Sequence, residues 1–308
     1  MKIAVICNTD SLALPVLNFL HKKGLLLEVG ILEKNAAVLL GAIQQIGIDK
    51  SRIQLFSNTG WKETLQTWLE RLKPDMTWVF AFPWRIPPFI LSIPSKGFFN
   101  FHFGSLPKYK GADPVFWQLK NIEAKSDLTI HLMTEQIDEG PVMLTHEIPI
   151  VPGENYGMLC SRMGGMAVGA VENFLNQYQN NTLTSQSRGA DESLFYHKPG
   201  EVELSINWKE QTAAEIEWLV NATNPKYGGA SARIRNMEVR FLEVTPANIE
   251  NAPDTEPGTI VYADALYGLI VACRNREFLK INIVQMSEGY FSGTKLFNMG
   301  IHQGEQFT

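Results

Sequence analysis

The sequence predicts an α/β protein of two domains, in which a parallel β-sheet flanked by helices is followed by a smaller, mostly-β domain. Its 308 residues suggest two domains, since one domain typically has about 150 residues. Hydrophobic residues make up 45% of the chain, which supports a buried core in each domain and excludes a disordered chain. Strand and helix patterns alternate in the first half, whereas strand patterns predominate towards the carboxyl terminus, and such alternation is typical of parallel sheets.

The first half opens with a strand pattern and then a helix pattern. Residues 2–7 (KIAVIC) are rich in β-branched side chains and lead into residues 8–11, a turn and helix N-cap. From Ser11 the apolar residues recur at helical spacing on one face, which predicts a helix. Further strands are predicted at residues 26–32, 76–82, 98–103 and 127–133, and further helices at 35–47, 61–72 and 113–121. The GxGxxG fingerprint of dinucleotide-binding proteins is absent from the sequence.

The second half begins with a long helix and a polar linker. Residues 155–178 predict one helix, loosened at Gly164 and Gly165, and residues 179–193 (QNNTLTSQSRGADES) are the best linker candidate. A helix at 212–223 and strands at 238–244, 258–263, 267–273 and 278–285 then indicate a small barrel or sandwich. We expect domains at residues 1–188 and 204–308, joined by a linker at 189–203.

Charge and cysteine content narrow the class of protein. The 27 Lys and Arg residues stand against 32 Asp and Glu residues, a net charge of −5, so no basic excess indicates a nucleic-acid-binding surface. Three scattered cysteines do not favour a disulfide framework or a metal site such as a zinc site. No apolar run approaches the roughly 18 residues of a membrane span, and polar residues 8–10 interrupt the amino-terminal apolar run before a signal-peptide core can form. We therefore expect a cytoplasmic protein without a membrane partner.

Three polar residues near predicted strand ends are candidates for catalysis. Asn100 and His102 are two apart on a predicted strand, so their side chains share a face near the strand's carboxyl end. Asp138 follows the next predicted strand in a turn, IDEGP. Each residue alone has an ordinary structural explanation, as a hydrogen-bonded pair under a loop or as a turn-initiating aspartate. Together, a histidine, a carboxylate and a neutral amide donor form a usable acid–base set.

Two segments around these residues resemble a known family. Residues 100–114 read NFHFGSLPKYKGADP, which resembles the signature of the folate-dependent formyltransferases, Asn-x-His-x-x-x-Leu-Pro-x-aromatic-basic-Gly-x-x-Pro. The IDEGP turn resembles the Asp-x-Gly turn of the same family. The likeness covers nearly the whole chain, since residues 205–230 and 279–307 resemble the opening and the close of the family's carboxyl-terminal domain. The two-domain arrangement is similar to that of the members that formylate methionyl-tRNA or sugar nucleotides.

The resemblance implies a fold, a reaction and a catalytic trio. It implies a Rossmann-like parallel-sheet formyltransferase domain followed by a small OB-like barrel, and 10-formyltetrahydrofolate as formyl donor without a metal. Asn100 would donate a hydrogen bond to the tetrahedral oxyanion, which is worth roughly 3 kcal/mol. His102 would take or give a proton near neutral pH. Asp138 would fix the imidazole tautomer and stabilise the imidazolium, or hold a water that moves the proton; whether His102 or Asp138 is the immediate base stays open.

The resemblance also implies a pocket for the flat pterin ring, formed by apolar walls and backbone groups of two loops. The residues assigned to this pocket are Ala81, Phe82, Trp84, Ile86, Phe89, Ile90, Thr134, Gln136 and Ile137. Core packing is the alternative explanation for the aromatic residues among them. Pro83, where the family usually has glycine, and Arg85 depart from the family pattern. We expect a positioning role for Lys110 and a structural role for His131.

The formyl acceptor is predicted from charge. Members that act on tRNA usually carry a basic insert after the second strand, but here residues 33–47 (EKNAAVLLGAIQQIG) are short and almost uncharged. Asn221 stands where these members usually have arginine, and in the linker Arg188 is opposed by acidic residues at 191 and 192. Residues 195–308 hold 10 basic against 14 acidic residues. We therefore expect a small amine such as an amino-sugar nucleotide. The alternatives are initiator tRNA, a catalytically lapsed folate- or RNA-binding module, and a formate-releasing hydrolase.

Overall fold

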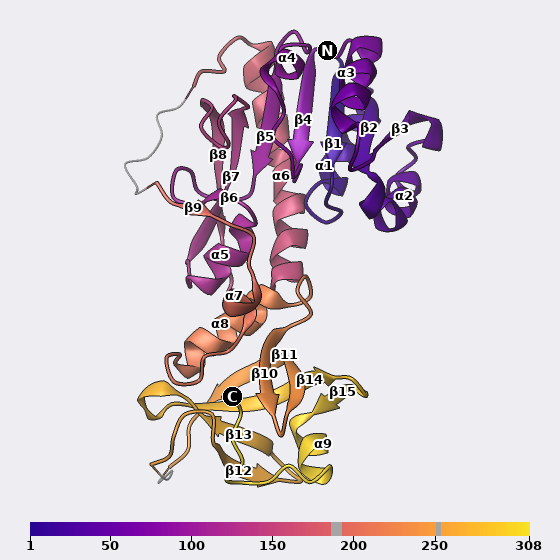
Figure 1. Ribbon diagram of the computed structural model, residues 1–308. Helices are drawn as coiled ribbons and strands as arrows, with labels where there is room; N and C mark the ends of the chain where they lie inside the picture. Colours follow the sequence, from indigo (N-terminus) through magenta and orange to yellow (C-terminus); the bar gives the residue numbers. More distant parts are fainter. Residues whose placement is uncertain (186–192, 251–253) are drawn as a thin grey trace. The chain divides into compact units, whose positions relative to one another are not determined.

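The computed structural model describes residues 1–185, 193–250 and 254–308, and these form two compact units (Figure 1). The first unit contains Met1–Pro114, Lys125–Pro149 and Cys160–Tyr196, and the second contains Val115–Ala124, Ile150–Leu159 and His197–Thr308. Residues 186–192, with Arg188, its acidic neighbours and the start of the predicted linker, lie outside the described residues. The domain boundaries that the sequence predicts at residues 188 and 203 stay a prediction.

The first unit contains a seven-stranded mixed sheet in the order β3-β2-β1-β4-β5-β7-β8. Its strands are β1 (Ile3–Cys7), β2 (Leu26–Leu32), β3 (Ile53–Phe56), β4 (Met76–Phe80), β5 (Phe98–His102), β7 (Lys125–Leu132) and β8 (Val142–Pro149). The first five strands in this order, β3, β2, β1, β4 and β5, are parallel to one another, but β7 is antiparallel to both β5 and β8. The parallel sheet expected from the sequence is present from β3 to β5 in this order, and β7 and β8 add an antiparallel edge to it. The loop between β7 and β8 is too short for a parallel crossover, which needs a dozen or more residues.

Helices connect and cover these strands. They are α1 (Leu14–Lys22), α2 (Ala36–Gln45), α3 (Trp61–Leu72), α4 (Pro88–Leu91) and α6 (Tyr156–Gln179), with short 3₁₀ turns η1 (Glu33–Asn35) and η2 (Lys50–Arg52). Helix α5 (Pro114–Lys120) belongs, after its first residue, to the second unit. Helix α1 begins at Leu14 and not at Ser11, since the preceding residues form a turn and Pro15 occupies the first helical turn, where its fixed φ is tolerated. Helix α6 runs unbroken through Gly164, where a side chain would meet the backbone oxygen of Ser11 at 1.9 Å.

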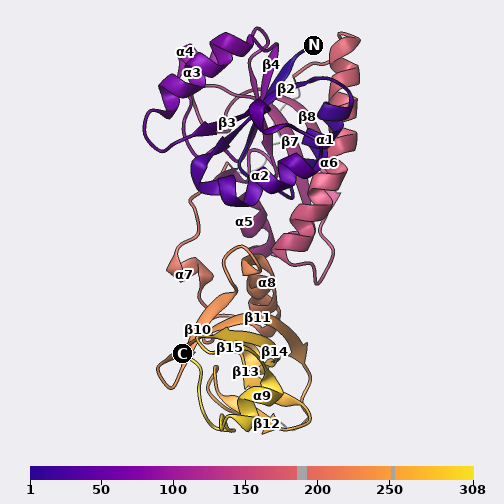
Figure 2. The ribbon, with the colours of Figure 1, turned by 90° about the vertical axis from the view of Figure 1, so that its right-hand side faces the viewer.

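Helices cover both faces of the sheet (Figure 2). Trp61, Leu65 and Trp68 of α3 pack into a cluster with Val79 and Phe98 on one face. On the other face, the Phe174 ring of α6 lies 5.9 Å from the Trp78 ring and 5.2 Å from the Phe99 ring. Because side chains alternate along a strand, Asn100 and His102 point to the same face as Phe98, the face covered by α3.

A short parallel pair lies beside the main sheet of the first unit. Strand β6 (Lys110–Gly111), which follows β5 in the chain, pairs with β9 (Phe195–Tyr196), which follows the predicted polar linker. The two strands lie side by side in Figure 1. Neither strand has a recognisable pattern in the sequence, since each is only two residues long.

The second unit is built on an antiparallel sheet with the order β10-β11-β14-β13-β12, and β15 pairs with β14. Its strands are β10 (Ala230–Ile234), β11 (Met237–Ala247), β12 (Ile260–Asp264), β13 (Gly268–Ala272), β14 (Phe278–Met286) and β15 (Gly289–Ser292). Its helices include α7 (Glu201–Leu204), α8 (Ala213–Thr223) and α9 (Gly293–Asn298), with the 3₁₀ turn η3 (Arg274–Arg276). Thr212 and Glu215 form a capping box at the start of α8. The predicted α/β domain followed by a small, mostly-β domain is thus confirmed.

Candidate active site

Strands β5 and β7 place three polar side chains on one face of the sheet. Asn100 is directly opposite His131 in the antiparallel register, and His102 is the last residue of β5. The amide nitrogen Nδ2 of Asn100 lies 3.1 Å from Nε2 of the His131 ring. His102 and His131 are both buried, with 5% and 2% of their surface exposed.

The loop between β7 and β8 brings Asp138 over these residues. Asp138 has a left-handed backbone (φ 55°), and the loop closes at Gly140, where a Cβ would meet the Leu132 carbonyl oxygen at 1.6 Å. Oδ1 of Asp138 lies 3.3 Å from Asn100 Nδ2, and Oδ2 lies 3.7 Å from Nδ1 of His102. The structure therefore brings Asn100, His102 and Asp138, the three predicted catalytic residues, into one buried cluster.

A backbone carbonyl sets the tautomer of His102. Nε2 of the ring lies 2.6 Å from the carbonyl oxygen of Tyr109, and a carbonyl only accepts hydrogen bonds, so Nε2 carries the hydrogen. Nδ1 then has a free lone pair that faces the Asp138 carboxylate. Burial lowers the pKa of His102 and outweighs the opposite effect of Asp138, so the ring is neutral at neutral pH. The hydrogen bond to Tyr109 thus favours the Nε2–H tautomer, and the tautomer-fixing role of Asp138 that the resemblance implies stays a prediction.

Asp138 is ionised in spite of its burial. Burial by itself raises the pKa of the carboxyl group, but attraction to His102 when its ring is protonated, contacts with His131 and the hydrogen bond from the Gly111 N–H lower it more, so that the pKa lies below its ordinary value. The Gly111 N–H donates to Oδ2 at 2.9 Å. The result is an ionised carboxylate next to a neutral imidazole lone pair, held by backbone as well as side-chain groups.

His131 is part of this cluster, although the sequence suggested only a structural role. Its Nε2 lies 3.3 Å from Oδ1 of Asp138 as well as 3.1 Å from Asn100. Its Nδ1 lies 3.2 Å from the carbonyl oxygen of Leu132. The sequence shows His131 as a histidine in the middle of an apolar strand. That this histidine lies next to Asn100 follows only from the pairing of β7 with β5, which the sequence does not show.

The loops predicted to hold the pterin ring lie next to each other. Nε of Arg85 donates to the carbonyl oxygen of Glu135 at 2.6 Å, and its Nη2 lies 3.1 Å from Oε1 of the same residue. Arg85, a departure from the family pattern, thus ties residues 81–90 to residues 134–138.

Only some of the predicted pterin residues have free side chains. Ile86 and Ile90 are buried in the core cluster of α3, and Phe82 and Trp84 pack against that cluster, with the Trp84 ring stacked on Trp61 at 5.0 Å. Packing therefore explains these four side chains. The exposed members of the set are Ala81, Phe89, Thr134, Gln136 and Ile137. The assignment of all nine residues to a ligand stays a prediction.

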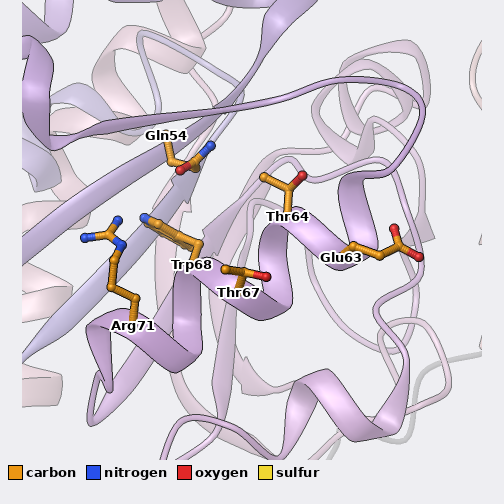
Figure 3. A pocket seen from close by; sticks show the side chains of 6 residues that line it. All are labelled: Gln54, Glu63, Thr64, Thr67, Trp68 and Arg71. Atoms are coloured by element: carbon orange, nitrogen blue, oxygen red, sulfur yellow. The ribbon is translucent and has the colours of Figure 1, made fainter.

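Other features of the described residues carry no catalytic group. A surface hollow at α3 and β3 is lined by Gln54, Glu63, Thr64, Thr67, Trp68 and Arg71 (Figure 3). Two of these side chains bind the carboxylate of Glu28, at 2.7 Å from Trp68 and 2.8 Å from Arg71. In the described part of the chain, no group of histidine, cysteine and carboxylate side chains has the arrangement of a metal site. Nor do its helices include one that is long and apolar enough to cross a membrane.

The fold and the cluster define a class of protein. A neutral imidazole lone pair beside an ionised carboxylate can accept a proton, and the adjacent amide of Asn100 can donate a hydrogen bond to developing negative charge. Placed on a mixed α/β sheet, such a set is suited to group transfer by general acid–base catalysis.

The chain belongs to the formyl transferase family. The family model for the formyl transferase domain matches residues 1–169, and the model for the formyl transferase carboxyl-terminal domain matches residues 201–300. The family and the enzyme class predicted from the sequence, a formyltransferase, are thereby confirmed.

Relatives with different acceptors share this likeness. The chain is 30% identical over 246 residues to the methionyl-tRNA formyltransferase of Nitrosomonas eutropha (strain DSM 101675 / C91 / Nm57), covering 79% of this chain and 76% of that protein. HypX from Aquifex aeolicus in complex with tetrahydrofolic acid superposes with a TM-score of 0.66 at 15% identity, over 98% of this chain and 48% of that chain. The Helicobacter canadensis N-formyltransferase in complex with folinic acid and dTDP-3-aminofucose superposes with a TM-score of 0.65 at 18% identity, over 91% of this chain and 98% of that chain. At these identities the two structures show a shared fold.

Proposed function

We propose that the protein transfers the formyl group of 10-formyltetrahydrofolate to a primary amine, with Asn100, His102 and Asp138 as catalytic residues. The observation that carries this proposal is the free Nδ1 lone pair of His102 beside Asp138, at 3.7 Å from Oδ2. A formyl transfer to an amine needs such a base, because the attacking nitrogen must lose a proton.

The reaction follows from the positions of these groups. The amine attacks the formyl carbon, and the carbonyl oxygen becomes the oxyanion of a tetrahedral intermediate. Asn100 donates to that oxyanion by exchanging its 3.3 Å bond to Asp138, which is longer and therefore weaker than an ordinary hydrogen bond. His102 takes the amine proton on Nδ1, and Asp138 stabilises the resulting imidazolium. The bond from carbon to N10 of the folate then breaks, and His102 returns the proton to N10.

The folate donor is supported by structures that share the fold. Two of them hold tetrahydrofolic acid or folinic acid. In this chain the exposed residues of the two loops bridged by Arg85, among them Phe89 and Ile137, offer an apolar surface next to the backbone groups that a pterin edge needs. Metal chemistry is not part of the proposal, because the acid–base set is complete in itself.

For the acceptor we propose a small amine, such as an amino-sugar nucleotide. Residues 195–308, which make up most of the second unit, hold 10 basic against 14 acidic residues and so have no basic excess for a nucleic acid. Three of its arginines pair with carboxylates: Arg235 with Glu305, Arg240 with Glu238 and Arg276 with Asp254. A tRNA acceptor would need several cationic contacts to its phosphates.

Methionyl-initiator tRNA is the second candidate. It is favoured by the 30% identity to a methionyl-tRNA formyltransferase over three quarters of both chains. The geometry of the trio and the membership of the formyl transferase family weigh against a lapsed binding module.

The experiment compares both acceptors directly. The protein is incubated with 10-formyltetrahydrofolate and either dTDP-3-aminofucose or methionyl-initiator tRNA, with His102→Ala as the inactive control. For a small-amine enzyme we expect formylation of the sugar nucleotide. We also expect tRNA binding with a salt slope shallower than about −2, against about −5 for an enzyme that contacts six phosphates. Efficient tRNA formylation with steeply salt-dependent binding would reverse this choice. If the folded protein formylates neither acceptor and also does not bind folate, the proposed function is wrong.

A further inference from the structure

The loop after β5 holds two of the three catalytic residues through its backbone. The Tyr109 carbonyl accepts the hydrogen bond of His102, and the Gly111 N–H donates to Asp138. Backbone groups cannot change rotamer as side chains do. The positions of both catalytic side chains therefore depend on what holds this loop.

At its near end the loop is held by β7. The Thr129 hydroxyl donates to the carbonyl oxygen of Gly104 at 2.9 Å, and the Ser105 hydroxyl donates to Oδ2 of Asp127 at 2.5 Å. These contacts fix Gly104 and Ser105, the second and third residues after the strand, but they lie several residues before Tyr109.

At its far end the loop is held by the segment that follows the predicted linker. The Lys110 N–H donates to the Leu194 carbonyl at 3.1 Å, and the Ala112 N–H donates to the Tyr196 carbonyl at 2.8 Å. The rings of Tyr109 and Tyr196 are stacked, with centroids 5.2 Å apart and planes at 14°. The backbone contacts, at Lys110 and Ala112, directly follow Tyr109 and Gly111, the two residues that bond His102 and Asp138.

The approach of the two backbones is close. Gly111 has a φ of 94°, and a Cβ at this position would lie 2.2 Å from the carbonyl oxygen of Tyr196. Only glycine allows the loop to pair with this segment and, at the same residue, to point its N–H at Asp138.

We propose that Leu194–Tyr196 is a positioning element of the active site, which keeps His102 in the Nε2–H tautomer and Asp138 beside it by holding residues 109–112. This inference rests on the catalytic roles of His102 and Asp138 proposed above. It means that Leu194–Tyr196, which the sequence assigned to the linker, completes the catalytic unit through the backbone of residues 109–112.

The test uses full-length protein labelled with ¹⁵N-histidine and the variants Tyr196→Ala and Tyr196→Phe. Tyr290→Ala is the matched control, because Tyr290 is an exposed tyrosine of the second unit, with 69% of its surface exposed. The ¹⁵N chemical shifts of the His102 ring, assigned by the signals that His102→Gln lacks, report its tautomer. The value of kcat and the KM for 10-formyltetrahydrofolate are measured with dTDP-3-aminofucose and with methionyl-initiator tRNA.

We expect the wild type, Tyr196→Phe and Tyr290→Ala to show a single Nε2–H tautomer. Tyr196→Ala should show a mixture of tautomers and a kcat lowered by about 10-fold or more, since a displacement of 1 Å can cost about 100-fold. Its KM for the folate should stay near the wild-type value. A purely structural role would lower stability without moving the tautomer signals.

Three results would overturn the inference: an unchanged His102 tautomer in Tyr196→Ala, an unchanged kcat, or the same damage in Tyr196→Phe, which keeps the ring and the backbone pairing. If Tyr196→Ala does not fold, Tyr196→Leu takes its place, because leucine fills the space without stacking. The tautomer measurement needs no acceptor. It therefore decides the inference even if neither probe is formylated, a result that would count against the proposed function instead.

Discussion

Replacement of Asp138 by asparagine tests the electrostatic core of the site. When Nδ1 of His102 takes a proton, the new charge lies 3.7 Å from Oδ2 of Asp138. Two unit charges about 4 Å apart attract by about 4 kcal/mol at an effective dielectric constant of about 20. Removing this attraction from the transition state corresponds to roughly a 10³-fold loss of rate. We therefore expect Asp138→Asn to lower kcat by about 10²- to 10³-fold.

The same substitution has a cost in stability with a defined pH dependence. In the wild type, Asn100 and the Gly111 N–H donate to the two oxygens of the Asp138 carboxylate. An asparagine offers only one oxygen and turns its NH₂ group towards the other donor, which is left unsatisfied. One unsatisfied buried group costs about 1–3 kcal/mol. Because the pKa of Asp138 is lowered in the folded protein, its ionised form stabilises the fold above the ordinary carboxyl pKa of about 4, and this contribution is lost as the pH falls below that value. The stability difference between wild type and variant should therefore shrink on acidification.

The assay combines kcat with the free energy of unfolding at several pH values. Glu147→Gln is the matched control, since Glu147 is an exposed carboxylate of β8 paired with Lys125 at 2.5 Å, and we expect no change in kcat from it. A folded Asp138→Asn protein with a kcat within a few fold of wild type would refute the assignment of a charge-stabilising role to this carboxylate.

Three other predictions concern the same unit. Because burial lowers the pKa of His102, kcat should fall only as the pH drops below the ordinary histidine value of about 6.5; a pH–rate profile with its acid midpoint above that value would contradict a neutral His102 base. Gly111→Ala should lower the free energy of unfolding by about 1–3 kcal/mol and also lower kcat, because the new Cβ meets the Tyr196 carbonyl at 2.2 Å; denaturant titration and steady-state rates check both, and an unperturbed variant would argue against the close approach. Ile90→Ala should cost about 2–5 kcal/mol of stability, since its side chain is fully buried, with kcat per folded molecule unchanged; a selective loss of kcat would show that this residue acts on the site.

The side-chain part of the candidate site could be predicted from the sequence. The two-residue spacing of Asn100 and His102 on a strand requires a shared face, and the structure places both on the α3 side of the sheet. Asp138 could be placed only through the family resemblance, because its approach depends on a loop with a left-handed residue and a close contact at Gly140.

The remaining part of the site has no local signal in the sequence. The role of His131 depends on the antiparallel register of β5 and β7, which places His131 opposite Asn100. This register cannot be predicted from the spacing of residues within either strand. The Tyr109 carbonyl is a backbone group, which every residue type offers. Strand β3 was missed because four residues are too few to show a period. Strand β8 was missed as well, and with it the antiparallel edge of the sheet, although the stretch between β7 and β8 is too short for a helical crossover.

The pairing of β6 with β9 has a consequence for synthesis of the protein on the ribosome. Strands β7 and β8 and helix α6 all lie between these two partners in the chain. At about 5–20 residues per second, a growing chain carries Asn100, His102 and Asp138 for several seconds before Tyr196 is made. During that interval the loop of Tyr109 and Gly111 lacks its partner strand. If Leu194–Tyr196 positions the catalytic side chains as we propose, catalytic competence is gained late in translation, after the sheet that bears the site has been completed.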